Sequence, residues 1–588
     1  MKSFEFKKKF LSRIIPGIVQ CDTGNLLPNP RLVSRTFHSD SDVQSDRSQL
    51  FTMFGQFTCH DLLLTPTQTQ VGNCCLSPET QNDFVNCLPI IVPPGDSFFQ
   101  TGQCLEFKRS TLFCDQTGAE RYHINRLSAY VDAGNVYGSD EQTSNQLRTF
   151  SGGLLKVTGP GNLLPVISGK FTGGDTRATE NPALATMHTI FMREHNRIAK
   201  LLALANPLLN DSELYKRARR IVIAEIQNIV FGEHLPLLIG TKSVFPADQG
   251  FTKYSPKVDP SIVNELSASA FRFGHSLANG FFSQNDPLTG SALGGYLLRI
   301  SNNNEVIYSS NPDLGMTSIA KGMSLQAAQA FDRFFTQELT NYLYASATNN
   351  FAFGSDLAAR NIQRGRDNGL SGWVFYRRLC YPSTSSSWTS RPSDISLDNW
   401  NKLKSLYTNV EDIDLFTGSL AEDPVTGGTL GKTAACIVEQ QFKRLISGDR
   451  YFFSHKSNNG NGNRIGNGNA KGNGNGNGNG KGNGNGNGNG NGIGNGNGNG
   501  NGNGNGNGNG NGNGNGNGNG NGNGNGNVGM KLTANQIKAV RKVRMFDVLC
   551  LNTNIQDLQR QAFKIPAASG NPLVPCSTAE SIDVSLFA

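Results

Sequence analysis

The chain has 588 residues, of which 37% are hydrophobic and 9% aromatic, and its formal net charge is +8 at pH 7. This composition indicates a globular protein with a large core. Lysine and arginine are dispersed, so nucleic-acid binding gets little support, and no stretch approaches the roughly 20 apolar residues of a membrane span.

The cysteines indicate an oxidising compartment. There are 11, several of them in a close group (Cys74, Cys75, Cys87, Cys104 and Cys114). Their spacing fits neither a repeated C-x-x-C zinc pattern nor a C-x-x-C redox pair, so disulfides are the preferred interpretation. The odd count leaves at least one thiol unpaired or paired with another chain.

The N-terminal segment 1–20 is basic, but Arg13 and Pro16 interrupt its apolar stretch, so we do not expect it to act as a signal peptide. The sequon Asn210-Asp211-Ser212 agrees with the cysteines in favouring secretion. A secreted chain without a signal peptide predicts a start that is incomplete or misassigned. Residues 1–25 are therefore treated as an N-terminal extension of uncertain structure.

Helical periodicity dominates the chain. Segment 183–205 places a set of apolar side chains on one broad face of a predicted helix (Met187, Ile190, Phe191, Ile198, Leu201 and Leu202). Segments 212–235 and 261–280 show the same spacing, and alternating strand patterns are short and few. The predicted fold class is mainly α.

Residues 458–529 are almost pure Asn-Gly repeat. They have few apolar side chains to offset the entropy of ordering, so we expect disorder. An expanded repeat in a surface loop is favoured over an interaction spacer or an aggregation element. Segments 433–453 and 532–552 flank the repeat with helical spacing, the second after an N-cap at Thr533. This predicts one domain, 26–457 and 530–588, interrupted by an insertion.

The eight histidines differ in their surroundings. Four lie in segments that resemble surface regions or helix ends, without strong partners (His38, His123, His234 and His455). His188 and His195 are seven residues apart on one predicted helix, whereas zinc-binding pairs are usually four apart, so we interpret them as structural. His60 and His275 remain, in two segments of unusual composition.

The segment "GQFTCHDLLLTP", 55–66, places Cys59, His60 and Asp61 in succession. It is compatible with a metal site, a nucleophile with its base, or polar positions on a buried helix. His275 lies among aromatic and small residues in "AFRFGHSLANG". Considered alone, each histidine is more readily a buried structural residue.

A series of motifs in order resembles the animal haem peroxidases: "GQFTCHDLLLTP", "NRLSAYVDAGNVYGS", "GDTRATENPAL", "MREHNRIA", "FRFGHS" and "NIQRGRDNGL". The invertebrate peroxinectin-like and chorion-type members look closest. The resemblance runs from about residue 26 to the C-terminus, without the Asn-Gly insertion. It implies a mainly α fold with haem b between helices.

The resemblance assigns the haem site to residues of these motifs. His275 matches the iron ligand, and Asn361 matches the residue that accepts a hydrogen bond from its second nitrogen. On the opposite face, His60 matches the base that moves the peroxide proton. The remaining matches are the distal cation Arg177, Gln56 one helical turn before His60, Glu180 and Arg272, and Cys59 is expected to line the haem site with them.

Asp61 points about 100° away from His60 on a helix, so it cannot face the same pocket. In the family it matches a calcium ligand, completed by the "SAYVDAG" loop through Ser128, the Tyr130 carbonyl, Asp132 and the Gly134 carbonyl. A capping or solvated Asp61 is the alternative. Gly134 lacks the hydroxyl that relatives often supply, which predicts a weaker site or an extra water.

Two positions depart from the family pattern. Cys59 stands where an aspartate commonly esterifies a haem methyl, so the resemblance implies at most one ester, through Glu180. Cys59 is expected to be a free thiol beside the haem edge or to form an unusual thioether, and a free thiol is preferred over a disulfide. Asn181 stands where the myeloid enzyme has a methionine linked to the haem, which makes chloride oxidation doubtful. Bromide, iodide, thiocyanate or phenolic donors are expected instead.

The resemblance also implies disulfides Cys380–Cys436 and Cys550–Cys576, and pairs Cys74 and Cys75 with Cys87 and Cys104 in an unassigned order. The expected function is reduction of hydrogen peroxide through a ferryl intermediate, with oxidation of a small donor by a secreted enzyme. One rival is a peroxidase-fold matrix or cell-adhesion protein with little or no turnover, bound to an extracellular partner. A second rival is a haemless calcium-binding scaffold.

Overall fold

The computed structural model describes residues 27–69, 72–114, 121–240, 252–300, 312–346, 348, 350–384, 387–455, 531–566 and 570–588, with short strands inside 480–507. The chain forms two compact units. The larger unit is Met1–Gln249, Ser255–Asp449 and Ala539–Ala588, and the smaller is Gly250–Tyr254 and Arg450–Lys538. Most of the predicted insertion 458–529, the extension 1–25 and Cys21 lie outside the described residues.

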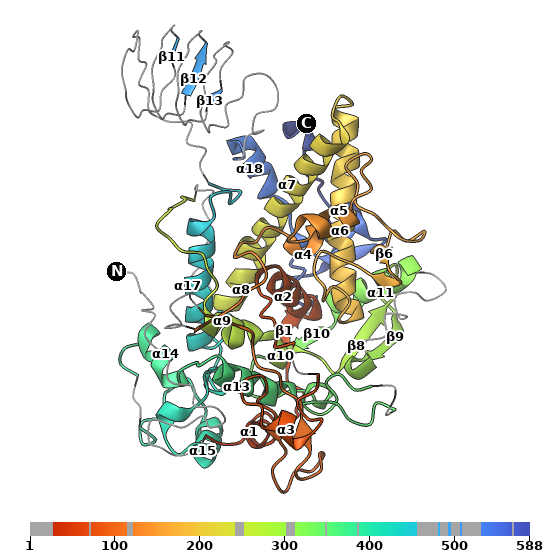
Figure 1. Cartoon of the computed structure of the whole chain (residues 1–588). Helices are drawn as coiled ribbons and strands as arrows, with labels where there is room; N and C mark the ends of the chain where they lie inside the picture. Colours follow the sequence, from red (N-terminus) through yellow and green to blue (C-terminus); the bar gives the residue numbers. More distant parts are fainter. Residues whose placement is uncertain are drawn as a thin grey trace. The chain divides into compact units, whose positions relative to one another are not determined.

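Helices dominate the larger unit (Figure 1), which confirms the predicted mainly α class. Its longer α-helices are α1 (Pro30–Phe37), α2 (Gln49–Leu62), α5 (Glu141–Leu147), α6 (Pro182–Ala205), α7 (Asp211–Ile229), α11 (Pro312–Leu325), α13 (Leu357–Asp367), α14 (Trp373–Cys380), α15 (Leu397–Leu406), α16 (Leu415–Leu420), α17 (Lys432–Gly448) and α19 (Met545–Asn552). Its short ones are α3 (Pro78–Gln81), α4 (Gly134–Tyr137), α8 (Leu235–Ile239), α9 (Asn264–Ala268), α10 (Gly274–Leu277) and α12 (Gln337–Thr340). Helix α18 (Ala534–Val540) precedes α19.

The strands of the larger unit form antiparallel pairs. They are β1 (Gln44–Ser48) with β10 (Ala327–Gln329), β2 (Ile90–Ile91) with β3 (Cys104–Leu105), β4 (Leu112–Cys114) with β5 (Arg121–His123), β6 (Val166–Ile167) with β7 (Lys170–Phe171), β8 (Phe281–Asn285) with β9 (Ala292–Leu297), and β14 (Asp557–Gln559) with β15 (Leu573–Pro575). In the smaller unit, β11 (Gly480–Lys481), β12 (Gly492–Asn495) and β13 (Gly506–Asn507) pair in parallel.

Helix α2 lies in the core and packs against α6, α10 and α11. Phe57 stacks on Phe191 of α6 with ring centroids 4.9 Å apart, and Phe54 lies 6.3 Å from the same ring. Helix α6 begins at Pro182, whose missing N–H suits the first turn, after the N-cap Asn181. This packing holds the "GQFTCHD" segment inside the protein.

The helix predicted over 212–235 is α7 followed by a π-helical turn, Val230–His234, and α8. Asp211–Ile239 is the one described helix with the length and hydropathy of a membrane span. However, 72% of its most apolar stretch of 18 residues is buried inside the protein. Such burial is typical of a core helix. The predicted helix 261–280 is instead broken into α9, a 3-10 turn at Ala270–Arg272 and α10, because Ser269 leaves the helical backbone region.

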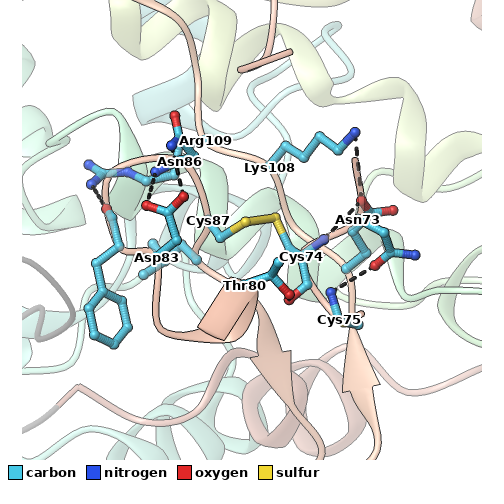
Figure 2. The surroundings of a disulfide bond; sticks show 12 residues. Asn73, Cys74, Cys75, Thr80, Asp83, Asn86, Cys87, Lys108 and Arg109 are labelled. Atoms are coloured by element: carbon cyan, nitrogen blue, oxygen red, sulfur yellow. Dashed lines mark hydrogen bonds and ion pairs between the residues drawn. A yellow bond between two sulfur atoms is a disulfide. The ribbon is translucent and has the colours of Figure 1, made fainter. Parts of the chain in front are cut away.

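Four disulfides join the larger unit. Cys380–Cys436 and Cys550–Cys576 confirm the pairs implied by the resemblance. The pairing that the resemblance left unassigned is Cys74–Cys87 and Cys75–Cys104. Figure 2 shows the buried Cys74–Cys87 bridge between two loops. Among cysteines whose side chains the structure describes, Cys59 is the free one.

The C-terminal segment packs against α6. Asn552 of α19 donates through Nδ2 to Glu194 at 2.6 Å, and its carbonyl accepts from Arg193 at 2.8 Å. Thr533 caps α18, because its Oγ1 accepts from the Gln536 amide at 3.3 Å, which confirms the predicted N-cap. After the repeat, Ala539–Ala588 therefore returns to the compact unit that contains α6.

The expectation for the four remaining histidines is wrong in part. His38, His234 and His455 are each 1% exposed and hydrogen-bonded, His38 to the Arg333 carbonyl and His234 to the Phe51 carbonyl. Aromatic neighbours from distant segments help to bury the rings of His38 and His234, so local sequence does not reveal their burial.

Candidate active site

A cavity of about 400 Å³ lies between α2, α10 and the loop that precedes α6. This volume is within the range of ligand pockets, about 300–1,000 Å³. The predicted residues that line it are Gln56, Cys59, His60, Arg177, Glu180, Arg272 and His275. His60 and His275, from distant parts of the chain, therefore face one cavity.

His60 is 4% exposed, and Gln56 precedes it by one turn of α2. Burial, and then the positive charge of Arg177, hold the pKa of His60 well below its usual range. The imidazole is thus neutral at neutral pH, so its contacts to Asp175 (3.9 Å) and Glu180 (3.7 Å) are not ion pairs. Its Nδ1 has no hydrogen-bond partner among the described residues.

Arg177 is held in place by Asp175, a residue that the sequence analysis missed. Nε and Nη2 of Arg177 donate to the two carboxylate oxygens of Asp175, each at 2.8 Å. The Arg177 backbone amide donates to the same carboxylate at 2.8 Å. This bidentate pair fixes a permanent cation beside His60. The signal for it was the "GDTR" turn, where the two residues lie two apart.

Glu180, Gln56 and Asn181 form a hydrogen-bonded row along the cavity wall. Gln56 Nε2 donates to Glu180 at 3.1 Å, and Asn181 Nδ2 donates to Gln56 Oε1 at 3.4 Å. Burial raises the pKa of Glu180, although Arg177 opposes this effect. The row fixes the direction of the Gln56 amide toward the cavity.

Cys59 lines the same cavity as a free thiol. Burial raises the pKa of the thiol, against the positive charges of Arg177 and Arg272. The sulfur is therefore protonated at neutral pH and is a weak nucleophile.

His275 of α10, which lines the same cavity, meets Asn361 of α13. Burial, and then the charge of Arg272, lower the pKa of His275 to about 3, so this ring is also neutral. The contact is 2.7 Å between His275 Nδ1 and Asn361 Nδ2. The prediction placed the Asn361 oxygen here. The nitrogen faces His275 instead because the oxygen accepts from Arg272 Nη1 at 2.8 Å.

Two further arginines that the sequence analysis did not assign, Arg360 and Arg364, line the cavity with Arg272. Burial and the charges of Arg272 and Arg360 lower the pKa of Arg364 to about 10, although Asp367 opposes this. Arg364 Nη1 pairs with Asp367 at 2.8 Å. The "RNIQRGRD" run brings these cations to one end of the cavity, where they favour an anionic group.

The predicted calcium ligands Asp61 and Asp132 lie close together at the C-terminal end of α2. Asp61 is 2% exposed; its Oδ2 accepts from the Ala133 amide at 3.1 Å, and Oδ1 has no partner in the described part of the chain. A Cβ on Gly134 would lie 3.5 Å from Asp61 Oδ1 and 3.3 Å from Asp132 Oδ1, so the two carboxylates converge there. Burial, and then Asp132, raise the pKa of Asp61 well above its usual range.

Neutral oxygens complete this pair of carboxylates. Ser128 Oγ donates to Asp132 at 2.8 Å and lies 3.4 Å from the Tyr130 carbonyl. The Gly134 carbonyl, expected as a ligand, accepts a hydrogen bond from the Gly138 amide at 2.8 Å, which leaves its second lone pair for a cation. Within the described ranges, no cluster of three or more His, Cys, Asp or Glu residues could hold a metal, so a cation here depends on these neutral oxygens.

Comparisons with known proteins agree with the motifs. A family model described as animal haem peroxidase matches residues 11–463. Chorion peroxidase of Drosophila melanogaster is 34% identical, covering 74% of this chain and 56% of that protein. Lactoperoxidase of Mesocricetus auratus is 34% identical, covering 73% of this chain and 65% of that protein.

Among solved structures, peroxidase A from Dictyostelium discoideum has a TM-score of 0.63 at 27% identity, covering 75% of this chain and 87% of that one. A fatty acid alpha-dioxygenase of Oryza sativa has a TM-score of 0.59 at 21% identity, which shows a shared fold alone. The chain spans less than two thirds of the length of the two curated relatives above. With the family match over most of its length, this chain belongs to the animal haem peroxidase family.

Proposed function

We propose that this chain is a secreted haem peroxidase that reduces hydrogen peroxide and oxidises a small donor. The observation that carries the proposal is the pair of neutral histidines, the buried His60 and the partly buried His275, on one cavity with Arg177 beside the first. A haemless scaffold has no chemical need of this arrangement.

The cavity suits haem b by its donor set. His275 offers a neutral imidazole, and the end lined by Arg272, Arg360 and Arg364 supplies positive charge for two propionates. Ligation through His275 Nε2 requires the ring proton on Nδ1. We therefore propose that Asn361 turns its amide by half a turn on loading, so that its oxygen accepts that proton.

Bound haem would supply an iron that accepts peroxide and stores its oxidising equivalents. His60 takes the peroxide proton at a ring nitrogen and returns it to the departing oxygen. Arg177 stabilises the negative charge that develops as the O–O bond breaks, and its fixed pairing with Asp175 avoids reorganisation. Gln56 orders the small molecules beside them.

Ester attachment of the haem is limited to one link through Glu180, because the Cys59 thiol cannot form an oxygen ester. Mass spectrometry of the haem peptide after proteolysis tests this assignment. We expect haem mass on the peptide that contains Glu180 and none as an ester on the peptide that contains Cys59. An ester on the latter would contradict the assignment.

We propose Ca²⁺ between Asp61 and Asp132, with Ser128 and the Tyr130 carbonyl. The support is the unpaired Asp61 oxygen and the mutual repulsion of two buried carboxylates, which a divalent cation would remove. The Gly134 carbonyl completes the proposed ligands, and because Gly134 has no side-chain hydroxyl, a water takes that position. The cation would fix α2, and with it the direction of His60.

The proposed domain is one peroxidase domain, 26–457 and 530–588, interrupted by the repeat. The support is the return of Ala539–Ala588 to the compact unit that contains α6. The four disulfides support an extracellular location. Asn181, in the Gln56–Glu180 row, favours bromide, iodide, thiocyanate or phenols as donors over chloride.

A stopped-flow measurement tests the function. Haem-loaded protein is mixed with hydrogen peroxide, and the Soret change and donor oxidation are followed in the wild type and in His60→Ala. His38→Gln, a buried histidine away from the cavity, is the matched control. We expect a loss of about 10²–10⁴-fold for His60→Ala and little change for the control. Haem binding without a peroxide response in the wild type would favour the adhesion alternative.

A further inference from the structure

The turn between α6 and α7 lies at the shared end of these two long helices (Figure 1). Helix α6 ends at Ala205 and α7 begins at Asp211. Two leucines at this turn are strongly exposed, Leu204 at 79% and Leu208 at 93%. Asn210 is also exposed, and it opens the Asn-Asp-Ser sequon of the chain.

The side-chain oxygen of Asn210 is hydrogen-bonded in the described structure, and its side-chain nitrogen is not. Oδ1 accepts from the Glu213 amide at 3.0 Å, and Glu213 Oε2 accepts from the Asn210 amide at 3.0 Å. This capping box is typical of a helix start. Nδ2 makes no hydrogen bond within the described ranges, so a group attached to it would not disturb the cap.

The other two sequon residues are also compatible with modification. Asp211 faces inward, because its carboxylate accepts from Arg148 Nη2 and from the Gly153 amide, each at 2.7 Å. Ser212 is exposed in the first turn of α7. The sequon thus presents Asn210 and Ser212 outward while Asp211 anchors the turn to the protein.

We infer that Asn210 is an N-glycosylation site. Nδ2 of Asn210 bonds to C1 of an N-acetylglucosamine unit of a lipid diphosphate-linked oligosaccharide. The bond from C1 to the phosphate oxygen breaks, the lipid diphosphate leaves, and Nδ2 loses one proton. The inference rests on the extracellular location proposed above and is independent of the haem chemistry.

A sugar chain at this place has a physical role. Leu208 lies two residues from Asn210 and exposes nearly its whole side chain. Exposed apolar side chains at a helical tip favour association between molecules. A hydrated glycan at Asn210 shields this tip from other copies of the chain.

The structure supplies matched variants for the test. Asn210→Asp keeps a side-chain oxygen for the α7 cap but removes the amide nitrogen, because aspartate and asparagine are equivalent N-caps. Ser212→Ala leaves Asn210 and its cap unchanged but removes the sequon hydroxyl. Both variants should fold as the wild type does, which separates loss of modification from loss of structure.

In the experiment, the full chain is expressed behind a secretory leader in eukaryotic cells. Its peptides are then analysed by mass spectrometry with and without N-glycosidase treatment in heavy-oxygen water. We expect hexosamine mass on the wild-type peptide, conversion of Asn210 to aspartate with one heavy oxygen after treatment, and neither signal in the two variants. Formation of Cys380–Cys436 shows that the chain has entered the oxidising compartment. An unmodified Asn210 in such disulfide-bonded protein, or a glycan retained in Ser212→Ala, overturns the inference.

Discussion

Gly55→Ala tests the contact that sets the distance between the two walls of the cavity. Gly55 lies in α2, one residue before Gln56. A Cβ at this position would lie 3.0 Å from Cζ of Phe273, which is two residues before His275, and 3.5 Å from the ring of His234. The absence of a side chain thus allows the helix that bears His60 to approach the segment that bears His275.

The expected change in stability is a difference between two opposing effects. Alanine in place of glycine stabilises a helix interior by about 1 kcal/mol. Overpacking of a buried contact costs about 1–3 kcal/mol. We therefore expect Gly55→Ala to change the free energy of unfolding by between about zero and 2 kcal/mol in the destabilising direction, with weaker retention of haem because the walls shift apart.

The assay is a double-mutant cycle with Phe273→Leu, which removes the ring atom that the new methyl group meets. Urea denaturation midpoints and the Soret absorbance after gel filtration are measured for the four proteins. In the Phe273→Leu background, Gly55→Ala is expected to stabilise by about 1 kcal/mol, since the helix propensity then acts alone. A stabilisation of equal size in both backgrounds would show that the Phe273 ring does not oppose a side chain at Gly55.

Three further predictions concern buried charges. Glu225 is fully buried, and burial together with Glu194 raises its pKa well above 4.5, so its contribution to stability is lost as pH rises through that raised value. Glu225→Gln should therefore raise the melting temperature at pH 8 more than at pH 5. An equal effect of the exposed control Glu141→Gln would contradict this. In a chelator, Asp61→Asn should stabilise the protein, because the substitution removes the repulsion with Asp132. In calcium, the same substitution should destabilise the protein, because it removes a ligand. A shift in melting temperature of the same sign in both buffers would disprove the proposed cation site. Burial and the charge of Arg177 lower the pKa of His60, so the rate of the peroxide reaction in the wild type should fall only well below pH 6.5. Arg177→Gln should slow the reaction and move this fall in rate to higher pH. A pH profile of the rate that does not move would show that another group titrates.

The sequence predicted those parts of the site that depend on one element. The resemblance supplied His60, His275 and Asn361, and helical spacing placed Gln56 on the same face of one helix as His60. The orientation of the Asn361 amide could not be predicted, because it depends on Arg272 from another segment. Asp175 escaped notice because a carboxylate beside an arginine in a turn resembles a solvated pair until its burial is known.

The fold shows the same limit. The long helices α6 and α7 carry their own periodicity and caps, so their existence followed from the sequence. The predicted helix 261–280 did not form, since the contact between Arg272 Nε and the Ser267 carbonyl at 3.0 Å stabilises a tight turn there. Apolar spacing alone does not distinguish this turn from a continuous helix. The burial of His38 and His234 likewise depends on partners hundreds of residues away or on other helices.

We propose that His275 binds the haem iron and that His60 faces the iron without binding it. Resonance Raman spectroscopy of the reduced, haem-loaded protein tests this directly through the iron–histidine stretching band. We predict that the band is present in the wild type and in His60→Ala and is lost in His275→Ala, with imidazole added to the buffer restoring it. A band that persists in His275→Ala without added imidazole, or that disappears in His60→Ala, would contradict the account.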